Sequence, residues 1–341
     1  MDEIIIPFKN AKVIGKNVDS EAYRKQLPGI DRGHPEFVMS RSELMLFASC
    51  PSRWIRGFQP KDTDATDWGS LIDCLLMDNG RFDDRFARQP ETCKATKSMQ
   101  CMKDGEAEVG DDVEWSPTSA EARAWKASQR GKIIVTPEDA TAADMAIGRL
   151  FTNEQIKALI ESSDFQVMVI GEYQDSETGL VIPIKALLDI VPRIGTAHGR
   201  KLADFKTIRS AAPRSHVKAI DERHYDAQGA LFTDLYVAAT GEDRNTFLHI
   251  VQENVPPFEP DCRMLSGDFL MLGRSKVISA LRDYCQCLAA NKWPCWSMER
   301  IEGFGVCSPE PYMVRYSAPI NISTAETEAE AVPEDETGIT P

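Results

Sequence analysis

Two runs of hydrophobic residues in the middle of the chain have the length and composition of β-strands. The segments 165–173 and 180–191 are rich in Val, Ile, Leu and Phe, and residues 175–179, Asp-Ser-Glu-Thr-Gly, separate them. Strand-like runs on either side of such a turn predict a β-hairpin. Further strands are predicted at 201–207, 246–253 and 261–265.

Segments with apolar residues at helical spacing lie before and after these strands. Thr136 and Pro137 have the residue types of a helix N-cap and first turn, so they predict a helix start. The charged, Gly-containing stretch 80–115 is predicted to be loop. Because helices surround a run of strands, the pattern predicts an α/β fold with one mixed central β-sheet flanked by helices. The predicted helices span about 40–50, 67–77, 117–129, 137–161, 222–239 and 267–290.

Three regions differ in composition along the 341 residues. Residues 1–38 are interrupted by Pro and Gly and are predicted to be an N-terminal extension. Residues 39–316 carry the predicted helices and strands and are expected to form one domain, since 42% of the chain is hydrophobic. Residues 317–341 hold six acids and no Lys or Arg, which predicts a disordered tail.

Charge and hydropathy narrow the class of protein. No apolar run approaches the ~18 residues of a membrane helix, and the N-terminal apolar patch is too short for a signal peptide, so we expect a cytoplasmic protein without a membrane partner. The net charge of −14 counts against non-specific coating of nucleic acid, because phosphate affinity comes from Lys and Arg. It does not exclude a metal-dependent enzyme, whose site needs carboxylates and whose cations reverse the local field.

Asp189, Asp204 and Lys206 are the residues that suggest chemistry. Side chains alternate between the faces of a strand, so Asp204 and Lys206 point the same way and Phe205 points into the core. If the strands pair around a turn at 192–199, Asp189 joins them. Two aspartates offer the oxygen ligands that Mg²⁺ prefers, and an ammonium can orient water or stabilise developing charge. The alternative is an ordinary exposed strand pair, because Asp-x-Lys is common by chance.

This pattern resembles the D…(D/E)xK signature of the PD-(D/E)xK nucleases, with their restriction-endonuclease-like core. The segment from Gly69 to Asp73 resembles the upstream helix of RecE-like and lambda-type exonucleases, which place a His or Glu metal ligand where this chain has Asp73. The resemblance implies one or two Mg²⁺ ions, with Mn²⁺ able to substitute. The implied ligands are Asp73, Asp189, Asp204 and the Phe205 carbonyl. For Asp73 the alternative is a helix acid at the solvent edge.

Two further segments extend the resemblance over about residues 38–250. Tyr225-x-x-Gln228 resembles the Tyr-x-x-Gln helix motif, which implies that Gln228 and Lys206 position the attacking water. The N-terminal segment resembles the part of RecB-family nucleases that approaches DNA, and in lambda-type enzymes an Arg near it holds the 5′-phosphate. Each of these residues also has a structural alternative on a solvated helix face. The implied DNA-binding residues are Ser40, Arg41, Ser42, Arg53, Arg209 and Tyr225.

The resemblance implies a Mg²⁺-dependent exodeoxyribonuclease that digests linear double-stranded DNA from its ends, 5′ to 3′, in phage-type recombination. It also implies a ring-shaped homo-oligomer and a single-strand annealing protein as partner. Two alternatives stay open. One is a Cas4- or AddB-like nuclease with an iron–sulfur cluster on Cys50, Cys285, Cys287 and Cys295, although the nine cysteines form no CxxC pair and we expect reduced thiols. The other is a non-catalytic DNA-binding protein of the same fold.

Overall fold

The computed structural model describes residues 4–61, 64–77, 79–96, 99, 106–295, 300–301 and 304–305. The chain divides into two units, Met1–Trp296 and Ser297–Pro341. In the second unit, β12 (Arg300–Ile301) pairs with β13 (Phe304–Gly305). The predicted acidic tail at 317–341 lies outside the described residues, as do Cys101 and Cys307. Within the described part of the chain, no helix has the length and hydropathy needed to cross a membrane.

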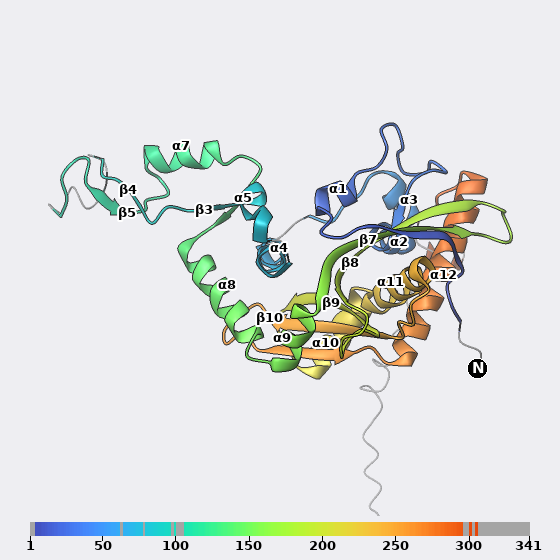
Figure 1. Cartoon of the computed structure of the whole chain (residues 1–341). Coiled ribbons are helices and arrows are strands. Elements are labelled where there is room, and N and C mark those ends of the chain that lie inside the picture. Colours follow the sequence, from blue (N-terminus) through green and yellow to red (C-terminus); the bar gives the residue numbers. More distant parts are fainter. Residues whose placement is uncertain are drawn as a thin grey trace, which may run out of the picture. The chain divides into compact units, whose positions relative to one another are not determined.

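The first unit is built on a mixed seven-stranded sheet with the order β1-β7-β8-β9-β10-β11, in which β2 also pairs with β8 (Figure 1). Strands β7, β8 and β9 are antiparallel neighbours, whereas β9 and β10 run parallel. The predicted fold class is therefore confirmed. The strands are β1 (Phe8–Gly15), β2 (Met39–Ser40), β7 (Ser163–Gln174), β8 (Val181–Pro192), β9 (Lys201–Ile208), β10 (Thr246–Glu253) and β11 (Pro260–Met264).

Helices cover both faces of this sheet and enclose a separate hydrophobic core on each. One core holds residues of α2 (Arg41–Ser49), α3 (Pro51–Ile55), α11 (Tyr225–Thr240) and α12 (Gly267–Ala290). The other holds residues of α4 (Asp64–Met77), α8 (Pro137–Leu150) and α9 (Glu154–Glu161). Side chains of β9 alternate between the two faces of the sheet and so contribute to both cores. Leu202 belongs to the first core, and Ala203 and Phe205 belong to the second.

Helix α11 is buried along most of its length, and its backbone packs directly against that of α12. A Cβ atom at Gly273 of α12 would lie 2.1 Å from the carbonyl oxygen of Asp226, so only glycine permits this approach. Close by, Arg274 forms a buried ion pair with Asp234 of α11, with Nη2 2.9 Å from Oδ1. The Asp234 carboxylate also accepts the backbone N–H of Ile6 at 2.9 Å, which fixes the N-terminal segment to the helix pair.

The predicted strands agree with the structure, as do the predicted helices other than the one at 137–161. Two predictions are wrong. The predicted helix at 137–161 is two helices, because Asn153 caps a new one by accepting from the N–H groups of Gln155 and Ile156. The stretch 80–115 is not loop throughout: it contains η1 (Asn79–Arg81), α5 (Phe82–Arg85), β3 (Phe86–Arg88), β4 (Thr92–Lys94) and β5 (Asp112–Glu114).

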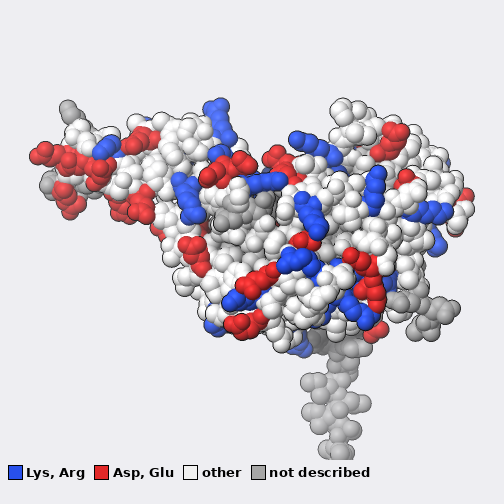
Figure 2. Space-filling model, viewed as in Figure 1, with Lys and Arg blue, Asp and Glu red and all other residues white. Residues whose placement is uncertain are grey.

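These short strands pair among themselves and not with the main sheet. Strand β3 runs parallel to β6 (Ile133–Val135), and β4 is antiparallel to β5. In sequence, β4, β5 and then α7 (Ala120–Ser128) all lie between β3 and β6. Figure 2 shows that Asp and Glu dominate the surface around β4 and β5. The sequence patterns also missed α1 (Ser20–Arg24) and α10 (Pro213–Glu222).

Candidate active site

The β8–β9 connection brings the two predicted aspartates together. Ile190 and Ala203 are partners in the antiparallel register, so Asp189 and Asp204 stand on adjacent strands one residue further on. The backbone N–H of Phe205 donates to Asp189 Oδ2 at 3.4 Å, and the Phe205 side chain is buried, as alternation predicts.

A network of polar side chains surrounds Asp204, which is only 1% exposed. Lys206, two residues along β9, forms an ion pair with Asp204 Oδ2. On the other side, Gln228 of α11 donates from Nε2 to Asp204 Oδ1 at 2.6 Å. Arg41, at the start of α2, donates from Nη2 to Gln228 Oε1 at 2.7 Å. Both amide atoms of Gln228 therefore have a partner, and Arg41 fixes which of them faces Asp204.

Helix α4 contributes the third carboxylate. A Cβ atom at Gly69 would lie 3.0 Å from Thr207 Oγ1 of β9, so glycine lets the helix approach the strand closely. Asp73 lies four residues later and hence on the same helix face, and it lines a cavity together with Asp189 and Asp204. The cavity has a volume of about 330 Å³, and Lys206, Gln228 and Arg41 also line it.

The electrostatics of these carboxylates are dominated by burial and mutual repulsion. Burial raises the pKa of Asp73 to about 7, with the Lys206 ammonium opposing and the Asp204 charge adding to the shift. Burial and the Asp204 charge likewise raise the pKa of Asp189 well above its ordinary value. For Asp204 burial acts in the same direction, but Lys206 and a hydrogen bond from Asp189 outweigh it and lower the pKa. Asp204 is therefore the carboxylate that stays ionised most readily.

A family model described as a PDDEXK-like domain of unknown function (DUF3799) matches residues 38–302 of the chain. The chain belongs to this family. The match covers every residue that faces Asp204 in the network above, including Arg41 and Gln228. No curated protein sequence matches the chain.

A solved structure shares the fold of this PDDEXK-like protein. It comes from Eubacterium rectale and is described as a candidate exonuclease. The two share 16% sequence identity at a TM-score of 0.50, and the alignment covers 90% of this chain and 100% of the other. At this identity the similarity shows the fold alone.

The donor set of the PDDEXK-like site fits a divalent cation. No three His, Cys, Asp or Glu side chains within the described ranges already stand around one point as metal ligands. Even so, Asp73, Asp189 and Asp204 face one cavity, and burial, together with repulsion by the Asp204 charge, raises the pKa of both Asp73 and Asp189. A hard cation with oxygen ligands relieves that repulsion, and these three carboxylates would hold it. The Phe205 carbonyl stays a prediction.

The residues predicted to contact DNA divide by position. Ser42 lines the cavity, whereas Ser40 is buried and caps α2 by accepting the N–H of Glu43 at 3.2 Å, which accounts for it without a ligand. Tyr225 is buried, with Lys206 Nζ 5.2 Å from its ring centroid. Arg53 does not line the cavity, and its guanidinium lies 3.8 Å from the ring centroid of Phe58.

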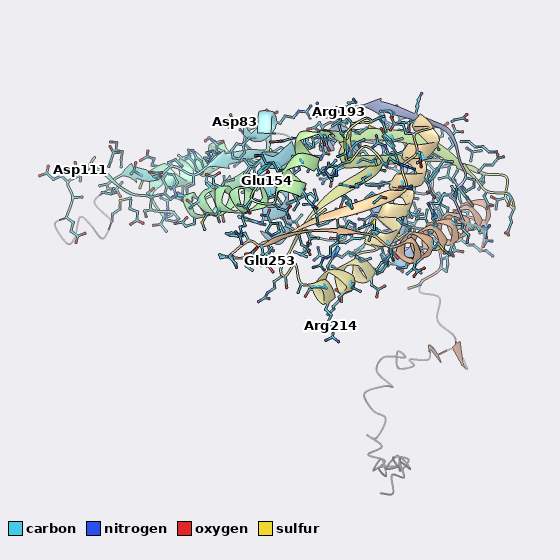
Figure 3. All side chains as sticks on the ribbon, turned by 60° about the horizontal axis from the view of Figure 1, so that its bottom comes forward. Asp83, Asp111, Glu154, Arg193, Arg214 and Glu253 are labelled. Atoms are coloured by element: carbon cyan, nitrogen blue, oxygen red, sulfur yellow. The ribbon has the colours of Figure 1, made fainter. Side chains whose placement is uncertain are left out.

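The basic stretch that follows Lys206 in sequence is not gathered at the cavity. Arg209 follows β9 directly, is exposed and does not line the cavity. Arg214, on α10, points away from the fold (Figure 3). His216 is buried, with Nε2 3.0 Å from Nδ1 of His249 on β10. These positions fit structural or surface roles better than contact with a substrate at this site.

Two lining residues carried no sequence signal. Tyr23 of α1 lies in a short helix that the patterns missed, and it lines the cavity from residues predicted to be an N-terminal extension. Gln166 of β7 has a φ of 46°, and its Nε2 lies 3.5 Å from Asp189 Oδ1. A positive φ in the middle of a strand is a strained geometry that sequence reasoning has no means of finding.

Proposed function

We propose that this chain hydrolyses phosphodiester bonds of DNA with the help of a divalent cation, Mg²⁺ in the first place and Mn²⁺ as a substitute. One observation carries the proposal: Asp73, Asp189, Asp204 and Lys206, from three separate elements, line a single cavity. Membership of the PDDEXK-like family supports it.

Each side chain has a role that its position allows. A bound cation would polarise the phosphate, lower the pKa of a coordinated water and neutralise the leaving oxygen. The Lys206 ammonium, whose pKa Asp204 and Asp189 raise against the effect of burial, stays charged and can hold the attacking water or stabilise charge that develops on the phosphate oxygens. Gln228, fixed by Arg41, holds Asp204 in place.

The test is cleavage of linear and closed-circular duplex DNA, labelled at the 5′ or 3′ end, with Mg²⁺, with Mn²⁺ and with EDTA. We expect cleavage that needs the cation and that Asp204→Ala abolishes while circular dichroism and thermal unfolding show a folded protein. Asp144→Asn, an exposed change on α8, is the matched control and should cut like wild type. A folded wild type that binds DNA but never cuts it with either cation would favour the non-catalytic alternative.

The finer activity is proposed on the resemblance to RecE-like and lambda-type exonucleases. We propose digestion of linear duplexes from their ends, 5′ to 3′, by a ring-shaped homo-oligomer that works with a single-strand annealing protein. Linear duplex should then disappear while closed circles persist, and the 5′ label should be released first. Light scattering on the purified protein should give a closed oligomer, and a monomer at assay concentration would contradict the ring.

A further inference from the structure

A second cavity adjoins the candidate active site. It has a volume of about 1130 Å³, and Tyr23, Arg24 and Ser42 line both cavities. From this shared wall it extends to Arg56 and Lys61, which follow α3 in sequence. Nothing in the proposed chemistry uses this second cavity.

The lining of the second cavity is basic in a chain whose net charge is −14. Two acids, Asp31 and Glu43, face five basic side chains, namely Arg24, Arg32, Arg56, Lys61 and Lys185. Glu43 is already engaged, since Arg32 Nη2 lies 2.8 Å from its Oε2 and Trp54 Nε1 donates to the same oxygen at 2.6 Å. The remaining cations leave the cavity with a net positive lining, which selects for an anionic ligand.

Lys185 on β8 is the most informative of these cations. It is 4% exposed, and in the described chain its ammonium forms no ion pair with a carboxylate. Nζ donates to the backbone carbonyl of Lys25 at 3.2 Å and lies 5.1 Å from the ring centroid of Tyr23. Burial lowers the pKa of Lys185, with Glu43 opposing. A buried ammonium that contacts no carboxylate is costly, and a bound anion would offset that cost.

We propose that the second cavity binds internal phosphate groups of a single DNA strand that leads away from the scissile bond, with Lys185 as the innermost phosphate ligand. This inference rests on the proposed function in that DNA is the ligand. Five cations from α1, β8 and the segments on either side of α3 line this one cavity, which matches a ligand that carries several phosphates. A positively charged groove that tracks the backbone is the usual way to hold a single strand.

The test is fluorescence anisotropy with oligo(dT) of twelve nucleotides, carrying either a 5′-phosphate or a 5′-hydroxyl, in EDTA so that no cleavage occurs. Lys185→Met keeps most of the apolar stem against Tyr23 and removes the charge. We expect Kd to rise at least fivefold for both oligonucleotides, and the slope of log Kd against log salt to fall by roughly 0.7 for each phosphate that the variant no longer neutralises. The double variant Arg56→Gln/Lys61→Gln changes only exposed residues, so it should weaken binding and lower the slope without loss of thermal stability.

Lys12→Met is the matched control, because Lys12 is exposed on β1 and should bind like wild type. Unchanged Kd and slope in Lys185→Met and in the double variant would overturn the proposal, as would a wild type that binds neither oligonucleotide. If the variants lost affinity for the 5′-phosphorylated oligonucleotide alone, the result would overturn the proposal in favour of a pocket for a terminal phosphate. Binding in EDTA is independent of cleavage, so a protein that binds through Lys185 but never cuts would refute the proposed function and leave this inference standing.

Discussion

Asp73→Asn should stabilise the metal-free protein while it abolishes cleavage. Asp73, Asp189 and Asp204 face one cavity, and burial raises the pKa of Asp73 to about 7 with Asp204 adding to the shift. An unfolded Asp titrates near 3.9. Because the folded state holds this proton more tightly than the unfolded chain does, the free energy of unfolding falls as pH rises from about 4 to 7.

The magnitude follows from the difference between the two pKa values. A difference of about three pKa units corresponds to an upper limit of about 4 kcal/mol at pH 8, and water that enters the cavity reduces this to roughly 2 kcal/mol. Asn is close to Asp in shape and carries no charge, so Asp73→Asn should recover most of that energy. For a domain of this size the gain corresponds to roughly 4 °C in Tm.

The assay is thermal unfolding in EDTA between pH 5 and pH 8, followed by a Mg²⁺ titration at pH 8. The variant should exceed wild type at pH 8, and the difference should shrink as pH falls toward 5. Mg²⁺ should stabilise wild type more than the variant, because a ligand of the folded state raises stability only where it binds. Asp144→Asn should show neither effect. Two results would refute this prediction. One is an Asp73→Asn protein that is no more stable than wild type at pH 8, and the other is a stability gain of the variant over wild type that is the same at every pH.

Three further outcomes are expected. Gly273→Ala should cost about 3 kcal/mol in urea unfolding, since its Cβ would meet the α11 backbone at 2.1 Å, whereas Gly267→Ala, with open space around it, should cost nothing. Burial lowers the pKa of His249 to about 3, so protonation of the unfolded chain should remove about 2 kcal/mol of stability between pH 7 and 5, and His249→Gln should lack this loss. Arg41→Met should slow single-turnover cleavage about tenfold, and adding Gln228→Met should cost little more, because the two side chains act through one hydrogen-bonded chain.

The part of the site that lies within one hairpin could be predicted from local sequence. Asp204 and Lys206 share a strand face because side chains alternate, and a short turn makes β8 and β9 neighbours, which brings Asp189 beside them. The prediction that Asp73 belongs to the site depended on the family resemblance, because the sequence of residues 67–77 does not indicate which face of that helix packs against β9. In the structure, the close approach at Gly69 provides the physical reason.

The contacts that local patterns could not predict join residues far apart in the chain. Arg41 reaches Gln228 across 187 residues, and Tyr23 enters both cavities from a five-residue helix too short for a periodic signal. In the sequence, Lys185 is a single charged residue within an apolar strand. The structure adds that its side chain is buried and that its ammonium donates to a backbone carbonyl. Long-range packing determines these positions, and that packing is what a single sequence does not contain.

The acidic net charge is compatible with a DNA substrate because part of the acid belongs to segments that line neither cavity. Exposed acids gather on and around β4 and β5, as Figure 2 shows, and six more lie in the C-terminal residues 317–341. At physiological ionic strength the field of an exposed charge fades within about 8 Å. The field that a DNA strand would meet in the second cavity therefore depends mainly on the lining, in which basic side chains outnumber acids five to two. Net charge describes the surface as a whole and gives no measure of affinity at this one cavity.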